Sequence, residues 1–251
     1  MLEIFRREFL ASFYSWRQWA WLVIASIAFS VLAYLLLTDK EMSLLNQDES
    51  LFLLTQIILS LGLVMSAATA SYSISNDRES GTFESMLLTP VSHRRILAEK
   101  LLHIIAIWIM MYLVSIPYIV VIAGGTSLIW PAVFYVGIYG TLLVAAVSSI
   151  GMILSIRLDS KSSITAALMV VLLLLAPSLF FATSLKNTDF GAVIESINPA
   201  SHAINSLDSV LVDNQASIGL QLNHLFVLVV FSLLFLGLLF AWYGRRLKVT
   251  E

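Results

Sequence analysis

The chain has 251 residues, of which 59% are hydrophobic and 12% are charged, and its formal net charge is −2. A soluble domain carries about 45–50% apolar and ~25% charged residues, so this composition predicts a protein whose main solvent is lipid. The near-neutral charge gives no indication of nucleic-acid binding. The lack of cysteine excludes disulfides and thiolate metal sites within the chain.

The first 18 residues are predicted to form an amphipathic helix. Large apolar side chains recur in them at helical spacing: Leu2, Phe5, Phe9, Phe13 and Trp16. The charged residues fall mostly on other faces, so we expect this helix to lie in the inner membrane interface and to lead into the first span. An ordinary juxtamembrane extension is the alternative.

Six segments are apolar over the ~20 residues that a membrane-spanning helix needs. They are Trp19–Leu37, Leu51–Ser75, Leu101–Ala123, Trp130–Ile156, Ser163–Thr183 and Asn223–Tyr243. The sequence therefore predicts an all-α integral membrane protein with six transmembrane helices. We treat 1–251 as a single transmembrane domain, with spans one to five within 19–183 and the last span and tail within 223–251. Proline at 117 and at 177 is expected to kink the third and fifth spans.

The basic residues indicate how the chain is oriented, because inner segments of membrane proteins are enriched in Lys and Arg. If the N-terminus is cytoplasmic, all 14 Lys and Arg residues except Lys40 and Lys186 lie in inner segments. We therefore expect both termini in the cytoplasm. Tight turns are predicted at 124–127 on the outer side and at 157–162 on the inner side.

The second span carries a stripe of polar and small residues: Gln56, Ser60, Ser66, Thr69 and Ser71. Such a stripe is predicted to face a substrate pathway or a subunit interface in preference to lipid.

A polar segment, 76–100, connects the second and third spans on the predicted inner side. Gly81 can adopt backbone angles that are closed to other residues, so it can end or re-aim a helix. Thr82 is predicted to cap a new short helix, with Glu84 in the first turn, where the helix dipole favours negative charge.

This short helix is predicted to be amphipathic and tightly bounded. Phe83, Met86 and Leu87 share one face of it. Pro90 disfavours helical geometry at the preceding residue, so the helix is only one or two turns long. Ser92 can then cap a further helix that runs into the third span. The arrangement suits a docking surface for a soluble partner, and an interfacial hairpin that merely returns the chain is the alternative.

The outer segment 184–222 is predicted to hold two short helices that pack at the outer leaflet or dip into it. Asn198 followed by Pro199 is typical of an N-cap and the first helical residue. Apolar residues at helical spacing support both helices: Phe190, Val193, Ile194 and Ile197 in the first, and Ala203, Leu207, Val210 and Leu211 in the second. A mobile loop is the alternative. For His202, near Asp208 and Asp213, a capping or surface role is favoured over a metal site.

The run Arg78-Glu79-Ser80-Gly81-Thr82-Phe83-Glu84, followed by Leu87-Leu88-Thr89-Pro90-Val91-Ser92, resembles the inner-loop motif of ABC-2 type transporter permeases. That motif is E-x-G-T-x-E, then two aliphatic residues, then Ser or Thr, Pro, any residue, and Ser or Thr. Its place between the second and third of six spans also fits the family, as do the N-terminal helix and the long segment before the last span.

The resemblance implies the permease subunit of an ATP-driven transporter, commonly an exporter, in the plasma (inner) membrane of a prokaryote. It implies partnership with a second permease subunit, identical or different, and with separate ABC ATPase subunits that bind ATP and Mg. Coupling to the ATPase would rest on Glu79, Gly81, Thr82, Phe83, Glu84, Met86, Leu87 and Pro90. The segment 190–212 would be an outer re-entrant hairpin, with Asn198, Pro199 and His202 in the outer gate.

The chain itself is expected to be no enzyme and to bind no cofactor or metal. It lacks the phosphate-binding motif G-x-x-x-x-G-K followed by Ser or Thr, and no inner segment is long enough for a nucleotide-binding domain. An intramembrane zinc protease is disfavoured because H-E-x-x-H does not occur.

A secondary carrier, or an accessory or regulatory membrane subunit without ATP coupling, is the alternative function. Carriers usually place ionisable residues at membrane depth. Asp, Glu, Lys and Arg are absent from the interior of all six predicted spans, which argues against a carrier.

Overall fold

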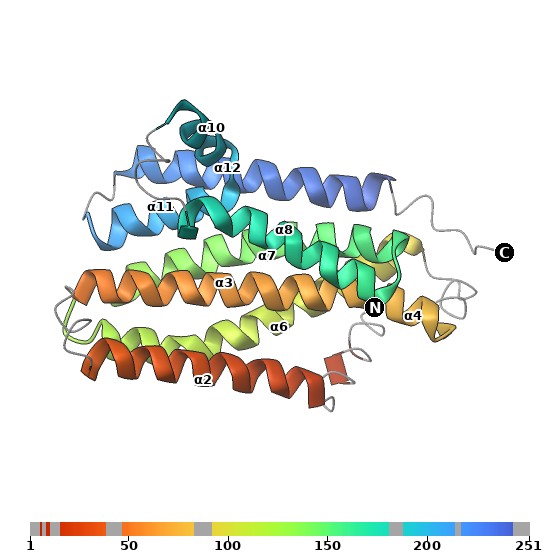
Figure 1. Cartoon of the computed structure of the whole chain (residues 1–251), viewed down its shortest axis with the longest axis horizontal. Coiled ribbons are helices and arrows are strands. Elements are labelled where there is room, and N and C mark those ends of the chain that lie inside the picture. The colour runs from red at the N-terminus through yellow and green to blue at the C-terminus, as the bar shows by residue number, and fades with distance from the viewer. Residues whose placement is uncertain are drawn as a thin grey trace.

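The computed structural model describes residues 6, 9–10, 16–38, 47–82, 92–180, 188–213 and 217–242. Within these ranges the chain is helical and has no strand (Figure 1). The helices are α2 (Trp16–Thr38), α3 (Gln47–Ser73), α4 (Ser75–Glu79), α6 (His93–Ile122), α7 (Ile129–Arg157), α8 (Ser160–Phe180), α10 (Asp189–Ile197), α11 (Pro199–Leu211) and α12 (Ile218–Gly237), which continues into a π-helical turn, η2 (Leu238–Trp242).

Among the described residues, six helices are long and apolar enough to cross a membrane. They cover Gln18–Thr38, Gln47–Glu79, His93–Ile122, Ile129–Arg157, Ser160–Leu179 and Ile218–Ala241. The predicted all-α fold with six spans is therefore confirmed. Figure 1 shows these helices side by side, each running opposite to the next, so that α2 begins and η2 ends near α4. We call this end of the bundle the α4 end and the opposite one the α11 end.

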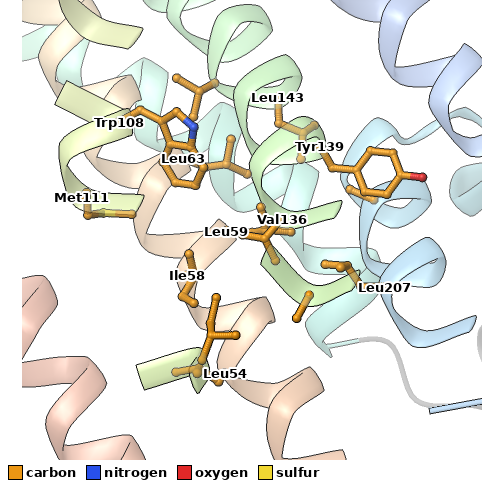
Figure 2. Packing of buried hydrophobic residues seen from close by; sticks show 14 of the residues in the cluster. Leu54, Ile58, Leu59, Leu63, Trp108, Met111, Val136, Tyr139, Leu143 and Leu207 are labelled. Carbon is orange, nitrogen blue, oxygen red and sulfur yellow. The ribbon is translucent and has the colours of Figure 1, made fainter. Parts of the chain in front are cut away.

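The centre of the bundle is formed by α3 and α7, the two most deeply buried spans. The Trp108 indole of α6 lies against both, and its ring is fully buried. A Cβ atom added to Gly62 of α3 or to Gly140 of α7 would lie 2.2 Å from that ring. Figure 2 shows the indole beside Leu63, at one side of the main hydrophobic core. Two glycines thus make the space that the largest core side chain fills.

The predicted turns between spans are confirmed. Gly125 has a φ of +87°, and the Thr126 amide donates to the Ala123 carbonyl at 3.0 Å, which closes the turn at the α11 end. At the α4 end, α7 ends at Arg157 and α8 begins at Ser160. The helices α6 and α8 continue through their prolines, and the kinks expected there stay predictions.

Two short helices, α10 and α11, occupy the segment before the last span, as predicted. The Thr188 hydroxyl caps α10 by accepting from the Gly191 amide at 3.2 Å. Asn198 caps α11 by accepting from the Ala200 amide at 2.9 Å, and Pro199 is the first residue of that helix. The apolar face of α11 is buried in the bundle, whereas α10 exposes its large apolar side chains. Their depth in a membrane stays a prediction. The predicted helix over 1–18 lies mostly outside the described residues.

Candidate functional site at the α4 end

The serine-rich end of α3 forms a break from which α4 departs. The hydroxyl of Ser73 donates to the Ala70 carbonyl at 2.8 Å. The hydroxyl of Ser75 donates to the Ser71 carbonyl at 2.9 Å. In a continuous helix these two carbonyls would accept from the amides of Ile74 and Ser75, four residues further on. Serine hydroxyls therefore take over the backbone acceptors at the point where the helix is interrupted.

The two amides at this break bind a side chain of α7. Ile74 and Ser75 both donate from their backbone nitrogens to Ser155 Oγ, at 3.0 and 2.7 Å. The Ser155 side chain is fully buried. Ser160 of α8 adds a hydroxyl contact of 3.2 Å to Ser75 Oγ. The break is thereby anchored to two other spans, and its buried polar groups have partners, as buried polar groups require.

Arg78 of α4 binds the carboxyl end of α7. Its Nη1 donates to the Ile156 carbonyl at 2.8 Å and its Nη2 to the Leu158 carbonyl at 2.6 Å. The last carbonyls of a helix have no partner within the helix, and a cation near them is favoured by the helix dipole. Each hydrogen bond from a charged group contributes about 1.5–3 kcal/mol, less where water competes for it.

Glu79, the next residue, binds the amino end of α8. Its Oε1 accepts from the Ser160 amide at 2.8 Å, where a carboxylate is favoured by the helix dipole. The first turn of α8 also has its own cap, because Asp159 accepts from the Ser162 amide at 3.2 Å. The hydroxyl and the amide of Ser162 hold the pKa of Asp159 below its ordinary value. Arg78 and Glu79 thus bind the two sides of the turn between α7 and α8.

An ion pair joins α4 to α6. The Nζ of Lys100 lies 2.6 Å from Asp77 Oδ2 and donates to the Ser73 carbonyl at 3.2 Å. Only 3% of the Lys100 side chain and 17% of the Asp77 side chain are exposed. Asp77 precedes the segment 83–91 and Lys100 follows it, so the ion pair holds together the two stems of the predicted docking segment.

Gly81 has the special backbone conformation that the sequence predicts. Its φ is +72°, a backbone conformation that other residues rarely adopt, and a Cβ atom there would meet nothing within 4 Å. Glycine is therefore required by the backbone conformation and not by a lack of space for a side chain. The Thr82 hydroxyl donates to the Asp77 carbonyl and contacts Ser80 Oγ, at 3.2 and 3.0 Å. The chain beyond α4 is therefore tied back to it on both sides of Gly81.

The described part of the chain contains some of the predicted coupling residues. Glu79, Gly81 and Thr82 lie together as described above. The others lie outside the described residues: Phe83, Glu84, Met86, Leu87 and Pro90. Ser92 precedes α6 in an extended conformation, as expected of an N-cap, but its side chain makes no capping hydrogen bond.

The polar stripe of α3 does not lie on a single face. Gln56, Ser60 and Thr69 are half-buried, whereas Ser66 and Ser71 are buried within the bundle. The hydroxyls along the stripe donate to carbonyls of α3 itself, for example from Ser60 to Gln56 at 2.8 Å. A role of these residues in a pathway or an interface stays a prediction.

At the α11 end, His202 contacts a second histidine. Its Nδ1 lies 2.9 Å from Nδ1 of His224, and its Nε2 lies 2.9 Å from the Ser196 carbonyl. Because a carbonyl only accepts, Nε2 of His202 must carry a proton, and a neutral His202 then accepts at Nδ1. Within the described ranges, no group of three or more metal-ligating side chains is found. The bond to the Ser196 carbonyl joins His202 of α11 to α10. Asn198 and Pro199 start α11, and a role of these three residues in an outer gate stays a prediction.

A buried hydrogen-bonded cluster at the same end was not predicted. Ser206 Oγ of α11 donates to Tyr139 Oη of α7 at 2.8 Å and also contacts Gln221 Oε1 of α12. Tyr139 Oη donates to Gln221 Oε1 at 3.2 Å, and Gln221 Nε2 donates to Ser209 Oγ at 2.8 Å. We call these four residues the Tyr139 cluster. Tyr139 and Gln221 carry polar groups on the predominantly apolar helices α7 and α12, which is a weak signal in the sequence, and the two serines lie among other polar residues of α11.

Comparison with protein-family models finds one match that covers nearly the whole chain. The model described as ABC-2 family transporter protein matches residues 2–246. No curated protein matches the chain.

Proposed function

The chain belongs to the ABC-2 family of transporter proteins and is a membrane-spanning permease subunit, and from this premise we propose that it serves an ATP-driven exporter. A separate ABC ATPase subunit supplies the energy. That ATPase binds ATP and Mg, and a second permease subunit, identical or different, completes the membrane part. The chain lies in the plasma (inner) membrane of a prokaryote with the α4 end in the cytoplasm.

The observation that carries this proposal is the polar network around α4. A loop that only returned the chain would need no ion pair between its stems and no bonds to the ends of two other helices. Here Asp77 and Lys100 join the stems of the segment at 2.6 Å, and Arg78 and Glu79 join it to the turn between α7 and α8. Such a network supports a segment that has to carry force, and the segment 83–91 is where we place the ATPase.

The geometry suggests how ATP binding would act on the spans. The Lys100–Asp77 pair keeps α4 and the start of α6 together, so a displacement of the docked segment reaches α3 and α6 at once. The break at Ile74 lets α4 tilt without unwinding α3, because its backbone groups are already bound by serine hydroxyls. ATP binding in the partner would therefore tilt α3, which packs against α11, together with α6.

Gly81→Val tests the docking assignment. Valine is strained at a φ of +72°, so the direction of the segment beyond α4 changes. We expect the variant to insert normally but to lose most of the ATPase subunit when the native complex is purified, and to lose transport. Glu84→Lys, which changes the predicted docking helix itself, should have the same effect.

Gly125→Val is the matched control. Gly125 has a φ of +87° and open space around it, so valine introduces the same kind of strain in a turn at the α11 end. This variant should retain the ATPase subunit. Normal ATPase content in Gly81→Val and Glu84→Lys would remove the docking assignment, and a transport-competent native complex without any ATPase would remove the proposed function.

A further inference from the structure

Two adjacent side chains of α4 bind backbone atoms on both sides of a single turn. Arg78 binds the Ile156 and Leu158 carbonyls at 2.8 and 2.6 Å, and Glu79 binds the Ser160 amide at 2.8 Å. We propose that Arg78 and Glu79 are positioning residues that make the α7–α8 turn follow the movement of the ATPase-docking segment. The proposal rests on the proposed function and adds the element that receives the movement.

The contact is well placed to transmit a displacement in either direction. All three bonds end on backbone atoms at helix ends, which are fixed with respect to the helix axis, unlike the tips of flexible side chains. The cation lies at the carboxyl end of α7 and the carboxylate at the amino end of α8, so each charge is favoured by the dipole that it meets. If Arg78 and Glu79 were exchanged, each charge would meet a helix end of the same sign and both contacts would be unfavourable. The order of the two residues along α4 therefore suits the order of the two helix ends that they bind.

The residues that lead from α4 toward the docking segment are bonded back to α4. Ser80 Oγ donates to the Asp77 carbonyl at 3.2 Å, and the Thr82 hydroxyl donates to the same carbonyl at 3.2 Å. The residues on both sides of Gly81 thus bind one carbonyl inside α4. A displacement of Thr82 therefore also displaces Arg78 and Glu79, because the few residues between them are held together by these hydrogen bonds.

The helix α8 continues the path to the opposite end of the bundle. Near its far end, the Leu174 carbonyl accepts from Asn198 Nδ2 at 2.7 Å, and Ser178 Oγ lies 3.0 Å from Ser201 Oγ. Asn198 also caps α11, so α8 is bonded to the start of that helix. Among the spans α8 is one of the less buried, which leaves it freer to shift than α3 or α7. The α8 helix thus connects Glu79 with the outer segment.

The test measures movement of the α7–α8 turn in the assembled complex. Because the chain has no cysteine, single cysteines at Lys161 and Ala241 accept spin labels at defined sites, one at the start of α8 and one in η2. In the otherwise unchanged complex, we expect the distance between these labels to differ between the nucleotide-free and the ATP-bound, hydrolysis-blocked states. In Arg78→Met/Glu79→Gln, the nucleotide-free distance should be retained and the nucleotide-dependent change should be lost.

Activity provides the second measurement. The double variant should keep its ATPase subunit and hydrolyse ATP, while transport per ATP falls about tenfold or more, the factor that a lost charge-assisted hydrogen bond corresponds to. Arg94→Gln is the control, because it removes an exposed arginine from the same end of the bundle. This control variant should change neither the nucleotide-dependent label distance nor the transport per ATP. A nucleotide-dependent distance change that persists in Arg78→Met/Glu79→Gln would overturn the proposal.

If the double variant distorts the α7–α8 turn, a cross-link between α4 and this turn provides an independent test. In Arg78→Met/Glu79→Cys/Ser160→Cys the native contacts are absent, and a short thiol-reactive linker that contains a cleavable disulfide can restore the connection. Transport per ATP should be low before linking, recover on linking and fall again on cleavage. Failure to recover would overturn the inference. An unchanged complex that holds its ATPase and transports, but whose label distance does not depend on nucleotide, would also overturn the inference. A native complex that holds no ATPase would overturn the proposed function instead.

Discussion

Lys100 is a buried cation that forms an ion pair with the carboxylate of Asp77. With only 3% of its side chain exposed, this lysine has lost nearly all of its water, a cost that the 2.6 Å contact with Asp77 and the bond to the Ser73 carbonyl offset. Removing one member of a buried ion pair leaves an uncompensated charge, whereas replacing both can be nearly neutral. The pair is therefore sensitive to single substitutions and tolerant of a matched double one.

Lys100→Met should lower the free energy of unfolding by roughly 3 kcal/mol. This value is at the low end of the range for a broken buried ion pair, because the Asp77 side chain is partly exposed to solvent. Asp77→Asn should cost less, and Lys100→Met/Asp77→Asn should recover most of the loss. Unfolding of the purified subunit in detergent, followed by circular dichroism, measures all three. Additive losses in the double variant would show that the two residues do not act as a pair.

At the scale of single helices, close packing depends on glycines that face a large ring. Gly140→Ala places a methyl group 2.2 Å from the Trp108 ring, which is itself enclosed between α3 and α7. We expect a loss of about 1–3 kcal/mol from overpacking. Gly140→Ala/Trp108→Leu should regain part of it. Thermal unfolding in detergent is the measurement.

Gly219→Ala in the first turn of α12 is the control for this packing prediction. A methyl group there meets nothing within 4 Å, and alanine is the better helix former, so stability should be unchanged or slightly raised. Equal losses at Gly219 and Gly140 would indicate that helix propensity, and not the Trp108 ring, decides the effect.

The sequence predicts a helix well where residues adjacent in the chain determine it, such as a long apolar run or a capping residue. Long apolar runs locate all six spans, although the helix of the third span begins at His93 and not at Leu101. Asn198-Pro199 marks the start of α11 correctly. The second span was expected to end at Ser75, and the structure adds α4 after a break at Ile74. The break arises because serine hydroxyls replace the backbone partners there. In the sequence alone, these serines look like an ordinary polar helix end, so they do not reveal α4.

The candidate site was less predictable because its partners are far apart along the chain. Glu79 and Ser160 are separated by 81 positions, as are Ile74 and Ser155. No local pattern shows that Glu79 meets a helix end of the same chain, so the motif alone suggested a contact with the ATPase for it. Gly81, by contrast, was recognised because its conformation depends only on its own missing side chain.

In the described part of the chain, the positive charge is concentrated at one end of the bundle. The described basic residues between the spans lie at the α4 end: Arg78, Arg94, Arg95, Lys100, Arg157 and Lys161. This distribution supports a cytoplasmic α4 end, since inner segments attract Lys and Arg. If the α4 end is cytoplasmic, the alternation of the six spans predicts that the α11 end lies on the other side of the membrane.

Labelling of single cysteines in intact cells tests this orientation. Asp213→Cys lies at the exposed end of α11 and should react with a membrane-impermeant thiol reagent added outside. Lys161→Cys is exposed at the α4 end and should react only after the cells are permeabilised. The cysteine-free chain is its own background control. The reverse pattern would invert the topology and would remove the ATPase from the α4 end.

A newly inserted subunit waits in the membrane for its partners, and during that time an unsealed outer end would leak ions. The Tyr139 cluster joins α7, α11 and α12 through hydrogen bonds made within a single chain, and all four of its residues are buried. These bonds form without the ATPase or the second permease. We therefore expect that a subunit that has not yet met its partners would not dissipate the membrane potential.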